Sequence, residues 1–353
     1  MSQTLPSLAA QPPWLQAQLQ QLLGRRAHAI LLSGPSGLGQ YDLALALASA
    51  WLCTAPTEHG ACGHCQSCHR VAVRTHPDLC VLLPEVLSLE LQWPLDEKVQ
   101  AELDSKKRKP SKEIKVEAAR EAVAFTQMTR SGGDTKVVLV YPAERMNSVT
   151  ANALLKTLEE PVGQVRFILA SEAADQLLPT LRSRCQIHTL LWPAFDDALA
   201  WLKGRAAEGR AAVDVQDLRV LLAAAGGRPD DVLARLRESD AKQAANQWRA
   251  LPKAVARGDA SVLAGWAPPQ AVDALQKLCH DVWALRLGAA PRYFDTQDLG
   301  PVRPGSASKA GLYAMGSWSR ELAASARSAE HPFNAGLMIE ALVSRAQQAL
   351  QAA

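Results

Sequence analysis

The sequence predicts an α/β protein in which a parallel β-sheet comes first and a helical region follows. Three observations lead to this class. Short apolar runs of strand length recur through the first half of the chain, and helix-like segments separate the later runs. Strands that alternate with helices form parallel, doubly wound sheets. After Pro193 the pattern becomes helical only.

Five runs are expected to form the strands of this sheet. The first, Ala29–Leu32, is continuously apolar, as a central parallel strand buried on both faces should be. The others lie at 76–84, 136–142, 165–171 and 185–191. Helices are expected over Tyr41–Leu52, Val116–Arg130 and Thr150–Glu160.

The remaining segments are helical or polar. Three short helices are expected at 195–209, 215–227 and 228–238. Longer helical runs follow Ser239, and a segment rich in proline and glycine interrupts them at 288–306. A long polar stretch at 88–114 is expected to contain a mobile loop, because connections of this length are uncommon in compact domains.

The composition is that of a globular, multi-domain protein. The 353 residues favour two or three domains, and a hydrophobic content of 48% excludes wholesale disorder. The net charge of +3 gives no argument for nucleic-acid or membrane binding. No apolar run reaches the ~18 residues of a membrane span, and no secretion signal is expected in the first residues. Seven cysteines then indicate the reducing cytoplasm, where clustered thiols tend to bind metal.

The stretch SGPSGLGQYDLA, residues 33–44, begins as a phosphate-binding loop of the pattern G-x-x-x-x-G-K-[ST] and then departs from it. Gly34, Gly37 and Gly39 supply the glycines, but Gln40 replaces the lysine and Tyr41 replaces the magnesium-binding hydroxyl. A lysine 4 Å from a phosphate charge contributes roughly 4 kcal/mol at an effective dielectric of 20. We therefore expect a degenerate loop that does not support ATP hydrolysis.

The second half of such a site is altered as well. An Asp that holds magnesium and a Glu that activates water normally follow a neighbouring strand. In KVVLVYPAERM, residues 136–146, Tyr141 and Pro142 occupy these two positions. Two alternatives remain open: the glycines form an ordinary strand-to-helix turn, or the loop binds a nucleotide without hydrolysing it.

Four cysteines form a closely spaced cluster of the pattern C-x8-C-x2-C-x2-C. They are Cys53, Cys62, Cys65 and Cys68. Four thiolates can enclose a tetrahedral zinc ion and leave no open coordination position, so a structural zinc site is expected. Binding of this kind contributes ~10–16 kcal/mol in small peptides.

Other interpretations of the cluster remain open. The last three cysteines begin like an iron–sulfur run, but Ala72 stands where its fourth cysteine would come. A histidine could replace one of the cysteine ligands; the candidates are His59, His64, His69 and His76. A disulfide is not expected in the cytoplasm. Cys80 and Cys279 are expected to be core thiols.

Two arginines, Arg182 and Arg184, lie just before the fifth expected strand in LLPTLRSRCQIHTLL. An arginine finger stabilises the charge of a phosphoryl-transfer transition state, and a chain without its own hydrolytic site could supply one to a neighbour. The other interpretation is a pair of solvated or ion-paired arginines.

These motifs together resemble the clamp-loader subunits of bacterial DNA polymerase III, relatives of the AAA+ ATPases, and among them the delta-prime type. The degenerate loop is what favours delta-prime over the ATP-hydrolysing subunits. The matching stretches cover most of the first 190 residues in order, and NALLKTLEEP together with SRC is quite specific. They are Pro13-Trp14, HAILLSGPSGLG, the four cysteines, THPDLCVLLPE, ANALLKTLEEP and SRC.

The resemblance implies three domains. An AAA+ P-loop-type parallel sheet domain would span 1–191 with an inserted zinc module at 53–68, followed by a small helical lid domain at 192–240 and an all-α collar domain at 241–353. The protein would be an ATPase-inactive accessory subunit of a DNA-directed DNA polymerase holoenzyme, a nucleotidyltransferase complex. Its implied partners are gamma/tau and delta subunits in a hetero-oligomeric ring, and through the ring the sliding clamp and primed DNA.

The resemblance also implies residue roles. Arg184, between Ser183 and Cys185, would reach into the ATP site of the neighbouring subunit, and the four cysteines would bind zinc. Asp230 falls about where active subunits carry a nucleotide-sensing arginine, with Arg228 nearby.

Alternatives from other classes remain. The chain could be an unusual active AAA+ ATPase, or a zinc-stabilised nucleic-acid-binding or scaffold protein outside a loader ring. The run KKRK at 106–109 could contact DNA phosphates, although a solvated loop is the favoured interpretation. Glu159 and Glu160 end an expected helix, where the dipole disfavours anions. This indicates either a partner contact or an ordinary solvated helix end.

Overall fold

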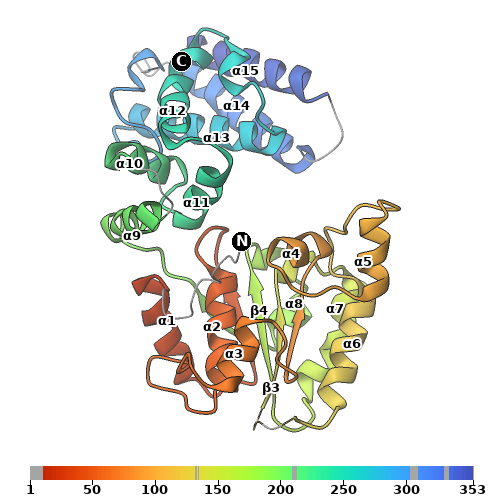
Figure 1. Cartoon of the computed structure of the whole chain (residues 1–353). Coiled ribbons are helices and arrows are strands. Elements are labelled where there is room, and N and C mark those ends of the chain that lie inside the picture. The colour runs from red at the N-terminus through yellow and green to blue at the C-terminus, as the bar shows by residue number, and fades with distance from the viewer. Residues whose placement is uncertain are drawn as a thin grey trace. The chain divides into compact units, whose positions relative to one another are not determined.

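The computed structural model describes residues 11–131, 133, 135–208, 213–302, 309–329 and 334–352. The chain divides into two compact units, the first ending at Trp192 and the second beginning at Pro193. The first unit contains the β-sheet and the second is helical (Figure 1). Residues 1–10, the start of the stretch in which no secretion signal is expected, and residues 303–306 of the expected interruption lie outside the described residues.

The sheet has five strands among the described residues: β1 (Ala29–Ser33), β2 (Leu79–Leu82), β3 (Lys136–Val140), β4 (Val165–Ser171) and β5 (Gln186–Thr189). All neighbouring pairs are parallel, in the order β2-β3-β4-β1-β5. The register places Leu31 of β1 between Leu169 of β4 and Ile187 of β5. The predicted α/β class, with a parallel sheet followed by helices, is confirmed.

Helices cover both faces of the sheet (Figure 1). Alternate residues of a strand point to opposite faces, so β1 contributes to two cores. Ile30 and Leu32 pack in the core with α1 and α2, while Ala29 and Leu31 pack in the core with α6 and α7. The helices of this unit are α1 (Pro13–Leu23), α2 (Gln40–Leu52), α3 (Gln66–Ala72), α4 (Glu85–Glu90), α5 (Glu97–Asp104), α6 (Val116–Gln127), α7 (Ser148–Glu159) and α8 (Pro179–Arg182).

The polar stretch 88–114 is not one long irregular loop, because it contains the end of α4 and the whole of α5. Its basic run is tied to Glu85, the first residue of α4. Arg108 donates to both carboxylate oxygens of Glu85, at 2.5 and 2.9 Å, and to Glu102 at 2.8 Å. Lys115 and the backbone N–H of Ser111 also donate to Glu85, at 2.6 and 2.8 Å. The expectation of a solvated loop is therefore wrong for Arg108.

These donors make Glu85 a source of pH-dependent stability. The hydrogen bonds from Arg108 and Lys115 outweigh burial and lower the pKa of Glu85 to about 2. A lowered pKa in the folded state stabilises the fold above the ordinary pKa of 4.5 and stops doing so as the pH falls toward 2. Because Arg108 and Lys115 are partly exposed, we expect Glu85→Gln to cost about 2 kcal/mol at pH 7.

Urea unfolding of the wild type and the variant at pH 7 and pH 3 measures this difference. The loss in free energy of unfolding caused by Glu85→Gln should be smaller at pH 3 than at pH 7. Glu117→Gln, at an exposed position on α6, should cause no comparable loss at either pH. A Glu85→Gln penalty that stays constant with pH contradicts the ion-pair origin.

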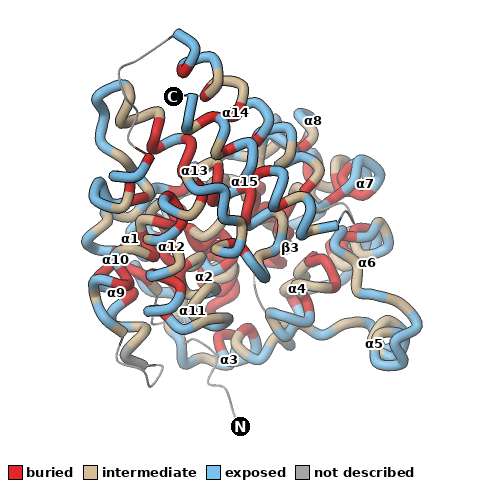
Figure 2. The backbone as a smooth tube through the Cα atoms, turned by 90° about the horizontal axis from the view of Figure 1, so that it is seen from above, coloured by how far each residue is buried: buried red, intermediate tan, exposed pale blue. Residues whose placement is uncertain are grey.

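The second unit is built from helices, and one apolar core joins buried positions chiefly of its later helices, from Trp248 to Ala349. Buried segments alternate with exposed ones along these helices (Figure 2). Trp248 and Phe294 stack in this core with ring centroids 4.5 Å apart. The helices are α9 (Phe195–Glu208), α10 (Val215–Ala224), α11 (Pro229–Glu238), α12 (Ala241–Ala256), α13 (Pro268–Arg286), α14 (Lys309–Ser328) and α15 (Ala335–Ala352).

A buried carboxylate anchors the segment that interrupts these helices. Asp281 of α13 accepts hydrogen bonds from the backbone N–H groups of Arg292, Tyr293 and Phe294 at 2.8–2.9 Å.

The separate lid and collar within this unit, divided at residue 240, remain a prediction. No described helix is both long and apolar enough to cross a membrane.

Candidate functional site

The carboxyl ends of β1, β3 and β4 meet at one edge of the sheet, and the glycine loop leaves β1 there. In this loop Gly37 and Gly39 have φ values of 76° and 86°, a left-handed conformation that side chains other than hydrogen disfavour. A Cβ at Gly34 would lie 3.2 Å from the Cβ of Leu190. The loop thus has the tight backbone that its glycines predict.

Gln40 turns back into the loop. Its side-chain nitrogen donates to the carbonyl oxygens of Gly34 and Pro35, at 2.7 and 2.6 Å, and the residue is only 2% exposed. An amide in the place of the lysine binds the loop's own backbone and carries no charge to offer a phosphate.

Tyr41 begins a set of aromatic side chains beside the loop. Trp93 donates its indole N–H to the Tyr41 hydroxyl at 2.6 Å, and the Tyr41 and Tyr141 rings lie 5.5 Å apart. Tyr141 donates to Glu172 at 2.7 Å. Burial raises the pKa of both tyrosines, so both stay neutral and are poor magnesium ligands. Aromatic rings therefore stand where an active site would carry a small hydroxyl and an Asp.

Sequence reasoning missed three residues of this group. Trp93 comes from the polar stretch 88–114, and its presence in a polar context was the only signal. Glu144 accepts hydrogen bonds from the Ser171 hydroxyl at 2.8 Å and the Glu172 backbone N–H at 3.1 Å. Glu144 and Glu172 are carboxylates at the sheet edge, and both are hydrogen-bonded to the protein itself.

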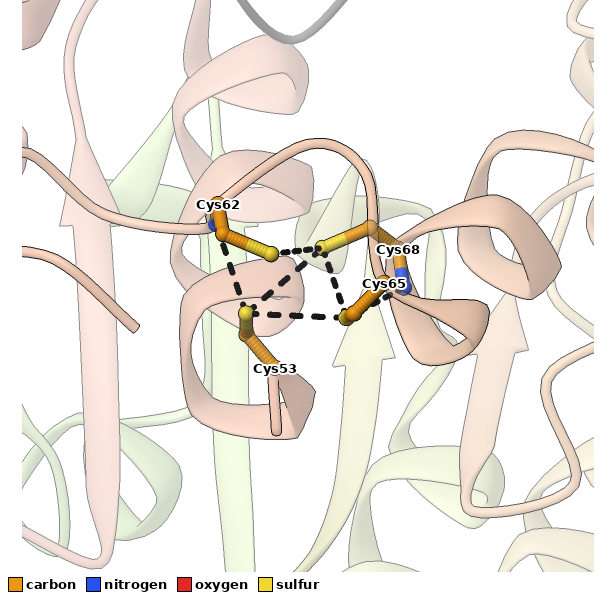
Figure 3. Close-up of side chains that lie close together, drawn as sticks. All are labelled: Cys53, Cys62, Cys65 and Cys68. Atoms are coloured by element: carbon orange, nitrogen blue, oxygen red, sulfur yellow. Dashed lines mark hydrogen bonds between the residues drawn. The ribbon is translucent and has the colours of Figure 1, made fainter. Parts of the chain in front are cut away.

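The four cysteines come together at the opposite end of α2 from the loop (Figure 3). Cys53 is the C-cap of α2, Cys62 lies in the segment between α2 and α3, Cys65 is the N-cap of α3, and Cys68 lies within α3. Sulfur–sulfur distances between them include values of 3.4, 3.6, 3.8 and 3.9 Å. Four sulfurs bonded at ~2.3 Å to a tetrahedral zinc ion would be ~3.8 Å apart, so the arrangement has the size of a Cys₄ zinc site.

The thiols differ in acidity. Burial acts to raise the pKa of Cys65, but hydrogen bonds from Thr54 and Cys68 outweigh it and lower the pKa to about 5. The backbone N–H groups of His64 and Cys65 lower the pKa of Cys62. Burial raises the pKa of Cys53 and of Cys68. A cation would favour the thiolate form of all four.

The histidine alternatives are not brought into the cluster. Among the described residues, this group of possible metal ligands consists of the four cysteines. His76 bonds to the Ser67 hydroxyl at 2.8 Å, His59 to Gln20 at 2.7 Å, and His64 to the Cys62 carbonyl at 2.8 Å.

Arg184 lies in the turn between α8 and β5, and its side chain is 31% exposed. Its guanidinium forms an ion pair with Glu159, the last residue of α7, and donates to the Thr180 carbonyl at 2.7 Å. In the isolated chain Arg184 is therefore ion-paired, as the second interpretation of the two arginines expects. Arg182, the other candidate, is the last residue of α8.

The two residues considered above for the place of a nucleotide-sensing arginine lie at the start of α11. Arg228 is the residue before this helix, and it donates to Asp231 and to the Ala225 carbonyl, both at 2.8 Å. Asp230 lies in the first turn of α11.

Comparison with known proteins identifies a matching family and several relatives. A family model described as DNA polymerase III, delta subunit, matches residues 12–192. DNA polymerase III subunit delta' of Pseudomonas aeruginosa is 42% identical over 221 residues, which cover 62% of this chain and 58% of that protein. Subunit delta' of Escherichia coli is 36% identical over 196 residues, covering 54% and 52%. The matched region is thus less than two thirds of each relative's length.

Among solved structures, a gamma subunit-related protein of DNA polymerase III from Thermotoga maritima is similar over 95% of this chain and 99% of that one. Its sequence identity is 14% and its TM-score is 0.42.

Proposed function

Since this chain belongs to the family described as DNA polymerase III, delta subunit, and resembles subunits named delta', we propose that it is the ATPase-inactive stator of a clamp loader. It holds its place in a hetero-oligomeric ring with gamma/tau and delta subunits. Through that ring it helps to load the sliding clamp onto primed DNA in the cytoplasm.

The observation that carries the proposal is the state of the glycine loop. The loop backbone is retained, but the Gln40 amide binds the loop carbonyls, and Tyr41 bonds to Trp93. Pro142 has no basic side chain with which to activate water. A triphosphate at this position would meet neither a lysine nor a magnesium ligand, so hydrolysis is not supported.

Zinc would serve the fold rather than the chemistry. The four thiolates would hold the ion as a closed tetrahedral set, with no position left for water or substrate. The ion would cross-link the end of α2 to the start of α3 and thereby fix a short segment that has little core of its own.

Arg184 would act on a nucleotide bound by the adjacent subunit. Its position in an exposed turn and its partial exposure support this role, and so does the resemblance of its S-R-C motif to clamp-loader subunits. Guanidinium keeps its charge at all physiological pH values and forks onto phosphate oxygens.

Purified full-length chain mixed with Mg-ATP is expected to show no ATP turnover above a blank. Mixed with the gamma/tau and delta subunits of its own cells, it should elute with them as one complex. Steady ATP turnover by the isolated chain would favour an active ATPase. Tight, salt-sensitive DNA binding without association with those subunits would favour the scaffold alternative.

A further inference from the structure

The Arg184 guanidinium is held in place by its own chain. Nε and Nη2 both donate to Oε1 of Glu159, and Nη1 donates to the Thr180 carbonyl at 2.7 Å. A longer contact of 3.4 Å joins Nη1 to the Ser183 hydroxyl. The guanidinium is therefore fixed along one edge and at Nη1 before any partner arrives.

Glu159 is poorly placed for the helix that carries it. It is the last residue of α7, where the helix dipole disfavours a carboxylate. Its side chain is 45% exposed and its partner is Arg184. A carboxylate at this position therefore benefits Arg184 more than it benefits α7.

The geometry leaves part of the guanidinium able to take a phosphate oxygen. Arginine carries five N–H donors, and the four contacts above use one on Nε, one on Nη2 and two on Nη1. The second N–H of Nη2 has no partner among the described residues, and the 3.4 Å contact of Nη1 is long enough to be exchanged readily. Glu159 can thus orient the group without occupying all of it.

We propose that Glu159 is a positioning residue, which orders the Arg184 guanidinium for the nucleotide of a neighbouring subunit. The proposal rests on the finger role proposed for Arg184. A donor that is already ordered stabilises a transition state without reorganising at the moment of reaction. An arginine that must first be ordered loses rotamer freedom, and that loss reduces its contribution.

The test uses the complete loader complex with clamp and primed DNA. Arg184-dependent turnover is defined as the ATPase rate of the wild-type complex minus that of the Arg184→Ala complex. We expect Glu159→Gln to lower the kcat of the Arg184-dependent turnover by roughly two- to fivefold, because a partly exposed ion pair contributes only a small free energy. KM should not change, because binding of the ground state is not affected. Glu159→Asp should restore part of the rate, and Glu160→Gln on the neighbouring exposed carboxylate should have no effect.

A second measurement uses the full chain alone. In ¹⁵N NMR spectra, the Arg184 Nε–H group should be ordered, and its proton protected from exchange with water, in the wild type and in Glu160→Gln. In Glu159→Gln the side chain should be mobile and the Nε–H signal averaged over its rotamers. A mobile Arg184 in the wild type contradicts the proposal. So does a Glu159→Gln complex whose turnover is unchanged or faster while Arg184→Ala still depresses it.

The proposed finger role fails in a different way. If Arg184→Ala itself leaves turnover unchanged, the finger role is wrong and Glu159 has no reactive group to position.

Discussion

Replacing Cys68 by serine is expected to remove tight zinc binding and to unfold the segment between α2 and α3. Cys68 is 1% exposed, and its sulfur lies 3.4–3.9 Å from the other three. Zinc contributes ~10–16 kcal/mol in small peptides, while whole domains are stable by only about 5–15 kcal/mol. We expect a loss of at least ~3 kcal/mol from the first unit, since a buried hydroxyl is a poor substitute for a thiolate ligand.

Zinc content per chain and hydrogen exchange over residues 53–72 measure this effect. Exchange is preferred to a single melting temperature, because a chain with two units need not unfold in one step. The control is Cys185→Ser, which should retain one zinc per chain. A wild-type protein prepared under reducing conditions without chelator that holds no zinc contradicts the site. Iron with visible absorbance would favour the iron–sulfur alternative.

Replacing Arg184 by alanine should silence the ATP site that this chain completes. An arginine finger is worth ~10³–10⁵ in rate at one site, so the loader complex should lose at least the whole share of turnover contributed by that site. Lysine should not restore it, because a point charge lacks the planar fork. Steady-state ATPase of the assembled complex, with clamp and primed DNA, is the measurement.

The fold of the Arg184→Ala chain should be intact. Its ion pair with Glu159 is partly exposed and is worth about 0–1 kcal/mol, so assembly and thermal stability should change little. Arg182→Ala, two residues upstream, is the matched control and should leave turnover unchanged. A complex that assembles normally and hydrolyses ATP at the wild-type rate without Arg184 contradicts the finger role.

The sheet could be predicted because parallel strands that are buried on both faces consist of short, continuous runs of apolar residues. Ala29–Leu32 is such a run, and it became the centre of β1. The cysteine cluster could also be predicted, because its ligands lie within sixteen consecutive residues and a short chain can close only a few ways around them. In both cases the information is local in the sequence.

The contacts that define the loop and the finger could not be predicted, because they join distant segments. Trp93 is 52 residues from Tyr41, and Glu159 is 25 residues from Arg184. Neither pair follows from helical or strand periodicity, since both depend on how elements pack. Glu85 likewise gathers donors 23 to 30 residues away, and the length and polarity of the stretch 88–114 give no sign of these contacts.

Helix α2 runs from the glycine loop to the first cysteine, and its length has a consequence for the metal. Thirteen residues at ~1.5 Å each make a rod of about 20 Å, with Gln40 at one end and Cys53 just beyond the other. An ion held by the thiolates is therefore too remote to touch anything bound at the loop. Loss of the metal would therefore affect the glycine loop only indirectly, through a shift of the whole helix α2.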